Sequence, residues 1–327
     1  MKLSILKWLL LTGGMTLQSI PAWAQSNSQS SYPTKPVSIV LPYVAGAASD
    51  IEVRYYLPSL MENLKQPFVI NYKPGAATRI GNAYVAKAAP DGYTLLFVTA
   101  AFPLSAIVAK DSPYDPIKDF APISMLTDYL NVVSVSNSLP VKTLAELVAY
   151  ARGNPGKLNH ATLGFGGASQ IAGAWLYSLA GVKVTYVSYK GTPEVWTDMM
   201  RGNAHVMITG PLGTGPLAKA GKIRAIAVTS QDRSPYFPGV PAVKETYPEY
   251  FYAQWSGFVA PARTPPAIID RLSLELGKAA RAPDVEPRLV ADARNILAST
   301  PEYFRKRLQD EVVMLRRVVS GLDIQSE

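Results

Sequence analysis

Three short loops of small residues carry the chemistry that this sequence offers. LPYVAGAASD (residues 41–50) and NYKPGAATRIG (residues 71–81) each place a Gly-Ala turn between a strand-like run and a helix-like run, and LGFGGASQ (residues 163–170) also precedes a helix. At such a helix start, unpaired backbone N–H groups and the positive end of the helix dipole can hold a carboxylate. For any single loop the alternative is an ordinary left-handed turn that uses glycine for its backbone freedom.

Residues for catalysis or metal binding are sparse. The chain has no cysteine and no Gly-x-Ser-x-Gly elbow, and its two histidines, His160 and His205, lack the spacing of a zinc site. The run Gly164-Phe165-Gly166 lacks the third glycine of a dinucleotide-binding motif, and no P-loop occurs. We therefore expect no enzyme, no cofactor and no metal.

The amino terminus has the pattern of a secretory signal peptide. Lys2 and Lys7 precede an apolar run, and Ala22-Trp23-Ala24 is a small-x-small cleavage site, so residues 1–24 are predicted to be removed and the mature chain to be exported. Removal of the two lysines lowers the net charge from +8 to +6. The basic residues are spread out without interleaved aromatics, which argues against nucleic acid as a partner.

Strand-like and helix-like runs alternate along the chain, as expected for α/β lobes. Predicted strands cover residues 37–41, 68–72, 94–99, 123–126, 132–135, 184–189, 206–209 and 225–229. Predicted helices cover residues 50–64, 79–87, 144–151, 170–180, 194–201, 212–220, 266–280 and 301–319, and Thr143 with Glu146 predicts a capping box. Connections near residues 133–136 and 250–256 would join two lobes, with a ligand cleft between them at the carboxyl ends of the strands.

The mature chain resembles the Bug-type (TctC-like) substrate-binding proteins of tripartite tricarboxylate transporters over nearly its whole length. The blocks that carry the resemblance are YPTKPVSIVLPYVAGAASDI, NYKPGAATRIG, AKAAPDGYTLLF, YDPIKDFAPIS, LPVKTLAELVAYARGNPGKLNHAT, VSYKGTPEVWTDMMRGNAHVMI and FVAPARTPPAIIDRL. The resemblance implies a two-lobed, type II-like periplasmic-binding-protein fold, a Venus flytrap whose lobes are mostly parallel sheets wrapped by helices. Lobe 1 would comprise residues 32–134 and 253–327, and lobe 2 residues 135–252.

The resemblance also implies a function. A monomeric protein in the periplasm would capture a small carboxylate by lobe closure and deliver it to the membrane permease subunits of the transporter. We expect an aromatic or extended dicarboxylate in particular, because the small-residue loops with Tyr43 and Val44 are less polar than is usual in the family and Arg79 could take a second carboxylate. Two alternatives remain: a periplasmic ligand sensor for a two-component kinase, and an exported hydrolase.

Candidate ligand-binding residues lie on the loops that the resemblance marks. They are Tyr43, Val44, Ala45, Gly46, Ala47, Ser49, Asp50, Gly75, Ala76, Ala77, Thr78, Arg79, Phe102, Phe165, Gly166, Ala168, Ser169, Gln170, Tyr189, Gly191, Thr192 and Asp198. Several have a second interpretation: Ser49 and Asp50 as helix caps, and Asp198 as a structural or cleft-edge hydrogen-bonding group. The rings of Tyr43, Phe102, Phe165 and Trp255 are candidates for ligand contacts, and each could equally be a packing residue.

Ala77, Thr78 and Arg79 stand where the second loop of the family usually has glycines, and Arg79 is the most informative of the three. A guanidinium turned into the cleft would clamp a carboxylate with two hydrogen bonds. The alternative is an exposed side chain in the first turn of a helix, where its charge opposes the helix dipole. Gln170 stands where the family often has histidine, which replaces a titratable group with an amide that both donates and accepts.

Overall fold

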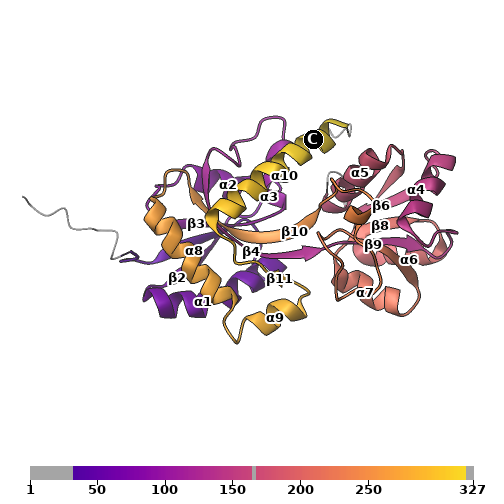
Figure 1. Ribbon diagram of the computed structural model, residues 1–327. Helices are drawn as coiled ribbons and strands as arrows, with labels where there is room; N and C mark the ends of the chain where they lie inside the picture. The colour runs from indigo at the N-terminus through magenta and orange to yellow at the C-terminus, as the bar shows by residue number, and fades with distance from the viewer. Residues whose placement is uncertain (1–31, 164–166, 322–327) are drawn as a thin grey trace, which may run out of the picture. The chain divides into compact units, whose positions relative to one another are not determined.

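The computed structural model describes residues 32–163 and 167–321 (Figure 1). The predicted signal peptide therefore lies outside the described residues. The strands are β1 (Val37–Leu41), β2 (Phe68–Tyr72), β3 (Thr94–Thr99), β4 (Phe120–Leu130), β5 (Val132–Ser136), β6 (Asn159–Leu163), β7 (Thr185–Tyr189), β8 (Val206–Thr209), β9 (Ile223–Val228), β10 (Ala253–Pro261) and β11 (Asn295–Ile296).

The helices cover the two sheets that these strands form. They are α1 (Ala48–Leu64), α2 (Arg79–Ala86), α3 (Ala101–Ile107), α4 (Leu144–Gly153), α5 (Ala168–Ala180), α6 (Thr192–Arg201), α7 (Pro211–Lys219), α8 (Pro266–Ala280), α9 (Glu286–Ala291) and α10 (Pro301–Gly321), with a 3₁₀ turn at Val243–Glu245. Among these described helices, none is both long and apolar enough to cross a membrane.

The strands assemble into two sheets, which confirms the two α/β lobes. The first has the order β11-β4-β10-β3-β1-β2 and the second the order β7-β6-β8-β5-β9. The expectation of mostly parallel sheets is corrected: β1 is parallel to β2 and β3, and β6 is parallel to β7 and β8, but β4, β5, β10 and β11 pair in antiparallel fashion. The sheets are mixed because strands that carry the chain from one sheet to the other run against the βαβ units.

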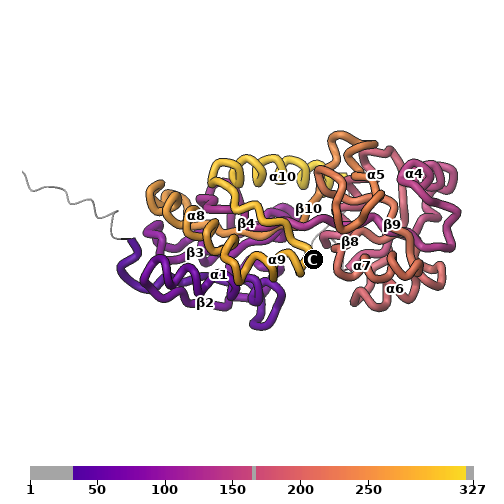
Figure 2. The backbone as a smooth tube through the Cα atoms, turned by 60° about the horizontal axis from the view of Figure 1, so that its bottom comes forward, coloured from indigo at the N-terminus to yellow at the C-terminus, as the bar shows by residue number. Residues whose placement is uncertain are grey.

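The chain passes between the sheets twice, and both passages are visible in Figures 1 and 2. Asn131 is the single residue between β4 of the first sheet and β5 of the second. The return runs from β9 into β10, and β10 pairs along β4 from Ala253 opposite Leu130 to Pro261 opposite Phe120. The sequence pattern had placed a connection at residues 250–256, where β10 in fact begins.

Local sequence explains where the helices begin and end. Thr143 Oγ1 accepts a hydrogen bond from the Glu146 N–H at 3.2 Å, and the Glu146 carboxylate accepts one from the Lys142 N–H at 2.6 Å. The predicted Thr143 cap of α4 is thus confirmed. Helices α5 and α6 end on Gly181 and Gly202, both in the left-handed conformation that glycine adopts without steric cost.

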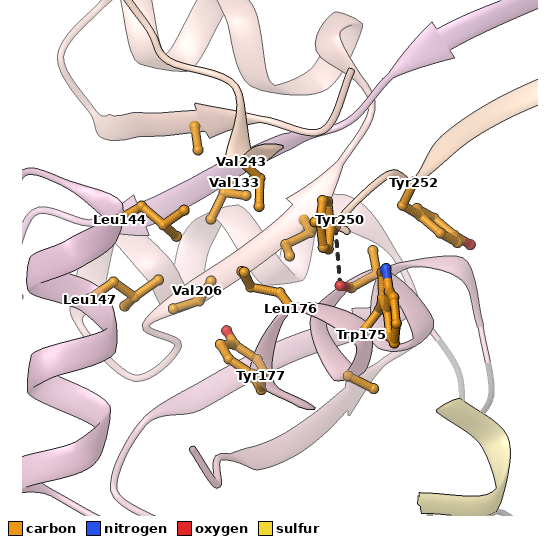
Figure 3. Close-up of a cluster of buried hydrophobic side chains, with 14 of the residues drawn as sticks. Val133, Leu144, Leu147, Trp175, Leu176, Tyr177, Val206, Val243, Tyr250 and Tyr252 are labelled. Atoms are coloured by element: carbon orange, nitrogen blue, oxygen red, sulfur yellow. Dashed lines mark hydrogen bonds between the residues drawn. The ribbon is translucent and has the colours of Figure 1, made fainter. Parts of the chain in front are cut away.

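Apolar side chains between the second sheet and its helices form an extensive buried cluster (Figure 3). Val133 and Val206 of the sheet pack with Leu147 of α4 and Leu176 of α5. Tyr250 is buried in the same cluster, and its hydroxyl donates to the Ala172 carbonyl oxygen at 3.1 Å. The segment that follows β9 is therefore fastened to the core of the second lobe before β10 enters the first sheet.

Helix α10 joins both lobes. Phe304 and Leu308 lie in the core cluster of the first sheet, while Leu315 and Val318 lie in that of the second. The guanidinium of Arg317 stacks over the Trp175 ring of α5, with 5.1 Å from Cζ to the ring centre. The packed faces of this amphipathic helix thus stabilise the two lobes together.

Candidate functional site

A pocket of about 630 Å³ is lined by residues from both lobes. The first lobe contributes residues of α1, β4, β10 and the loop after α9, and the second contributes the carboxyl ends of β6 and β8 and the starts of α5, α6 and α7. The lining residues are Ala48, Ile51, Tyr55, Tyr129, Asn131, Leu163, Ala168, Ser169, Thr192, Ile208, Thr209, Gly210, Pro211, Leu212, Gly213, Gln254, Asp292 and Arg294.

Four helices begin at this pocket. Ala48 opens α1, Ala168 opens α5, Thr192 opens α6 and Pro211 opens α7, and all four residues line the cavity. Their N-cap residues are alanine in α1 and glycine in the other three, so none of these N-cap side chains bonds to a first-turn N–H group. Backbone donors and helix dipoles at helix starts of this kind favour negative charge nearby.

Arg294 supplies the positive side chain of the pocket. Its Nη1 lies 3.1 Å from Glu52 Oε2 and donates to Thr127 Oγ1 at 3.2 Å, and its Cζ lies 5.1 Å from the centre of the Tyr129 ring. The Arg294 side chain is only 13% exposed. Glu52 is buried in α1 and compensates the charge of the guanidinium, which holds the pair in place.

Asn131 places an amide at the passage between the sheets. Its backbone N–H donates to Thr229 Oγ1 at 2.8 Å, and its carbonyl oxygen accepts from the Thr229 N–H at 2.9 Å. Its side chain is buried beside the pocket, and Nδ2 has no hydrogen-bond partner within residues 32–163 and 167–321. A buried donor without an acceptor is costly, so a ligand oxygen or a water molecule would stabilise it.

The first predicted loop contributes its end to the pocket. Ala48 lines the cavity, whereas Val44, Ala45 and Gly46 are exposed and do not. Tyr43 is half-buried, its hydroxyl lies 2.6 Å from Thr99 Oγ1, and burial raises its pKa. Ala48 is flanked by the N-cap residue Ala47 and by Ser49 in the first turn of α1. The part of the first loop nearest the cavity is therefore the part where α1 begins.

Asp50 is not an N-cap residue and does not line the pocket. It is buried and accepts hydrogen bonds from the Gly46 N–H at 2.8 Å, the Tyr72 hydroxyl at 2.8 Å and Arg54 Nε at 3.0 Å. Burial raises its pKa, but these donors outweigh burial and the pKa is lowered. Its carboxylate shapes the first loop.

The second predicted loop lies outside the pocket and has an unusual backbone. Gly75 has φ 122°, and Ala76, Ala77 and Thr78 follow with φ 46°, 49° and 76°. Ala76, Ala77 and Thr78 therefore adopt the left-handed conformation although each has a Cβ, and this costs roughly 1–2 kcal/mol for each residue. Thr78 is buried, and its Oγ1 accepts a hydrogen bond from Asn82 Nδ2 of α2 at 3.0 Å. This hydrogen bond holds the turn against the helix that follows it.

Arg79 begins α2, near enough to Tyr114 for its charge to act on that hydroxyl. Its positive charge acts to lower the Tyr114 pKa, although burial dominates and raises that pKa. Arg79 does not line the pocket. The charge that the sequence pattern assigned to Arg79 is supplied there by Arg294.

The third predicted loop reaches the pocket through α5. Ala168 and Ser169 line the cavity, and Ser169 Oγ accepts from the Leu163 N–H at 3.2 Å. Gln170 follows in the same helix and is 2% exposed. Phe165 and Gly166 lie outside the described residues.

The start of α6 brings one further predicted residue to the pocket. Thr192 lines the cavity, next to the N-cap Gly191. Tyr189 points to the body of the helix instead, where its hydroxyl donates to Asp198 Oδ2 at 3.0 Å. Burial, together with this hydrogen bond, raises the pKa of Tyr189 to about 12. Asp198 thus has the hydrogen-bonding role that the sequence favoured over direct ligand contact.

Two aromatic candidates are packing residues. Phe102 is 2% exposed and stacks on Tyr114, with ring centres 5.5 Å apart. Trp255 is 2% exposed, and its Nε1 donates to Glu311 Oε2 at 2.7 Å. Tyr55 and Tyr129, which the sequence did not single out, are the aromatic residues of the pocket.

Sequence reasoning missed most of the second lobe's contribution. Strand β8 was predicted, but not that its end and the Gly210-Pro211 start of α7 would line the site. That glycine-proline pair after a strand was a usable signal, since proline favours the first turn of a helix. Arg294 and Asn131 had no local signal, because their position depends on tertiary packing. Within the described residues, no cluster of His, Asp or Glu has a metal-binding arrangement.

Residues 53–324 match the sequence pattern of the tripartite tricarboxylate transporter family receptor, TctC. A UPF0065 protein from the TAR-I ttuE-ttuC' intergenic region of Agrobacterium vitis is 32% identical over 310 residues, which cover 94% of this chain and 89% of the relative.

Solved structures show the same fold. The periplasmic binding protein BugD matches with TM-score 0.68 and 28% identity, covering 90% of this chain and 100% of BugD. Rpa4515 of R. palustris, solved with adipate, has TM-score 0.69 and 29% identity, covering 88% of this chain and 97% of its own. MatC from Rhodopseudomonas palustris, with bound malate, has TM-score 0.68 and 27% identity, covering 88% of this chain and 100% of MatC. The chain therefore belongs to the TctC (Bug) family of solute-binding receptors of tripartite tricarboxylate transporters.

Proposed function

We propose that this protein captures a small carboxylate in the periplasm and delivers it to the permease subunits of a tripartite tricarboxylate transporter. The observation that carries the proposal is the pocket between the lobes, at which α1, α5, α6 and α7 begin without side-chain caps. Such a cavity suits a carboxylate, because several N–H donors can converge on its oxygens. No bond is made or broken.

Ligand capture would proceed by movement of the two lobes relative to each other. The division into lobe 1 (32–134 and 253–327) and lobe 2 (135–252) stays a proposal, as does closure of lobe 2 over the ligand. Closure would bring the exposed loop residues Val44, Ala45 and Ala77 nearer to a ligand held at the helix starts. The closed form would then be the one that the permease recognises, since a receptor must signal its loaded state.

The class of ligand follows from the pocket lining. Ile51, Leu163 and Leu212 are apolar, Tyr55 and Tyr129 add rings, and Arg294 adds a charge. These surroundings favour a carboxylate with an extended or aromatic body over a small, wholly polar one. Adipate and malate, which accompany the two R. palustris relatives, are natural first probes.

A charge placed at the pocket tests the site. Leu212 lies in the first turn of α7 and is 60% exposed, so Leu212→Glu should fold normally, because acids are favourable in a first helical turn. Isothermal titration with a panel of mono- and dicarboxylates should show at least tenfold weaker binding in Leu212→Glu. Leu212→Gln, matched in size and uncharged, should bind like the parent protein.

The outcomes separate the possibilities. A folded parent protein that binds none of the panel, or that hydrolyses an ester, would overturn the transport proposal. Equal loss in Leu212→Glu and Leu212→Gln would indicate a steric effect and would remove the electrostatic argument for this pocket.

A further inference from the structure

Arg294 is the one cation among the described residues that line the pocket, and Asp292 is the other charged one. It belongs to the loop between α9 and β11, far in sequence from every loop that was predicted to bind ligand. Its side chain is mostly buried, so each of its N–H groups needs an acceptor from the protein, from water or from a ligand.

The hydrogen bonds of Arg294 use one end of the guanidinium. Both protein acceptors, Glu52 Oε2 and Thr127 Oγ1, are reached by Nη1. Within residues 32–163 and 167–321, Nε and Nη2 have no acceptor. Since arginine carries five N–H donors in a planar fork, the greater part of this fork is unused by the protein. The hydrogen bond to Thr127 and the 3.1 Å approach to Glu52 both involve Nη1, and the residue that carries this guanidinium lines the pocket.

Glu52 has enough other donors to hold that nitrogen in place. Its Oε1 accepts from the Tyr56 hydroxyl at 2.9 Å and from Thr127 Oγ1 at 3.1 Å, and also from Ser256 Oγ. Oε2 is the atom that faces Arg294. The buried carboxylate is thus fixed to α1, β4 and β10 at once, and it orients the guanidinium together with the Tyr129 ring on which Arg294 lies.

We propose that the side of the Arg294 guanidinium away from Nη1 binds a second carboxylate of the ligand, while the helix starts of the second lobe hold the first. The inference rests on the proposed function and adds to it that Arg294 selects diacids over monoacids. Glu52 is the positioning residue: it neutralises the empty site, and a ligand carboxylate then shares the guanidinium through the planar fork that Glu52 leaves open.

A comparison of matched acids tests the proposal. The probes are adipate with hexanoate, malate with 3-hydroxybutyrate, and terephthalate with benzoate, each titrated calorimetrically into the parent protein and into Arg294→Gln and Arg294→Lys. We expect at least one diacid to bind tenfold or more tighter than its monoacid in the parent protein. In both variants that ratio should fall toward one, while the affinity for the monoacid stays within about threefold.

Arg294→Lys separates loss of the planar fork from loss of charge, because it keeps a positive charge beside the buried Glu52 and is therefore less prone to misfold than Arg294→Gln. Arg281→Gln is the matched control for long-range charge: Arg281 is exposed, and its Nη2 donates to the Leu297 carbonyl oxygen away from the pocket. It should leave the diacid-to-monoacid ratio unchanged. Thermal unfolding without ligand checks that each variant is folded.

Two results would overturn the inference. One is a parent protein that binds a diacid and its monoacid equally well; the other is a loss of affinity in Arg294→Lys that is the same for both acids, which indicates a purely structural arginine. Either result leaves the proposed carboxylate transport intact. Absence of binding by the parent protein to every probe would instead overturn the proposed function itself.

Discussion

The Gly46 N–H donates a hydrogen bond to Asp50 Oδ2 at 2.8 Å, so the acid of the first loop is turned back onto its own loop. Tyr72 and Arg54 complete the donor set of this carboxylate. An acid that looked like a ligand-binding candidate therefore holds the end of β2 and the start of α1 together. The loop keeps its form through these contacts, before any ligand is bound.

Asp50→Asn tests this arrangement. The neutral amide loses the charge-assisted hydrogen bonds, and we expect the free energy of unfolding to fall by about 1–3 kcal/mol in urea denaturation near pH 7. Because the folded-state pKa is below the ordinary value of 3.8, the contribution is present above that value and disappears as the pH falls through the lowered pKa. The variant should therefore approach the parent protein in stability at strongly acid pH.

Asp310→Asn is the matched control for that substitution. Asp310 lies on the exposed face of α10 and pairs with Lys306 in solvent. Its replacement should change the free energy of unfolding by less than about 0.5 kcal/mol. Equal effects of the two substitutions would contradict the role given to Asp50.

His160 predicts a second pH effect. The ring is buried, its Nε2 donates to the Ser169 carbonyl oxygen at 3.2 Å, and Nδ1 accepts from the Tyr177 hydroxyl at 2.9 Å. Burial lowers the pKa of His160 to about 4, against an ordinary value of 6.5. The unfolded chain binds the proton first, so stability should fall as the pH drops from 6.5 to 4, by about 3 kcal/mol in total.

Urea denaturation at several pH values measures that loss. His205 is the other histidine of the chain, and it is partly exposed. His205→Asn should keep most of the pH dependence between 6.5 and 4. An imidazole resonance of His160 that titrates near 6.5 in the folded protein would contradict the prediction.

The left-handed turn at residues 76–78 predicts a stabilising substitution. Ala77 has φ 49°, where a Cβ is unfavourable, and it is exposed. Ala77→Gly relieves this cost, although the greater freedom of glycine in the unfolded chain offsets part of the gain, so we expect between 0 and about 1 kcal/mol of added stability.

Ala83→Gly is the comparison within the same segment. Ala83 lies inside α2, where glycine costs about 1 kcal/mol relative to alanine. Opposite signs are thus expected for the same chemical change a few residues apart. A clear loss of stability in Ala77→Gly would show that the left-handed turn is not populated in solution.

Gly257 in β10 predicts a steric effect. A Cβ at this position would lie 2.9 Å from Met125 Cα and also contact the Ser124 carbonyl oxygen, both on the neighbouring strand. Gly257→Ala should therefore separate β10 from β4 and destabilise the protein by several kcal/mol, as overpacking against rigid backbone does. Gly277→Ala in α8 has its nearest neighbour at 3.7 Å and should stabilise by about 0.5–1 kcal/mol. Thermal unfolding of the pair measures the contrast.

Much of the fold followed from local pattern. Strands β1, β2 and β3 have the bounds that the strand-like runs of the sequence predicted, and the Thr143 cap fixed the start of α4. Strand β10 was missed because its start lies in a proline- and tyrosine-rich stretch that is typical of a loop. Antiparallel pairing was missed because local sequence carries no information on which way a distant strand runs.

Pocket residues were predictable only where the start of a helix is enough to place them at the pocket. Ala168, Ser169 and Thr192 reach the pocket because they open helices after strands. Arg79 also opens a helix, but α2 begins at a turn outside the pocket. Arg294 reaches the pocket through α9 and the two-residue strand β11, which no periodicity could reveal at that length.

The pairing of β4 with β10 limits how the lobes can move. Two strands hydrogen-bonded side by side up to Leu130 and Ala253 form a ribbon, and a ribbon bends and twists far more easily than it stretches or slides. Relative motion of the lobes should then be a rotation with its axis close to Asn131. The position of the Asn131 side-chain amide in the pocket would then change with the angle between the lobes, whichever acid the pocket holds.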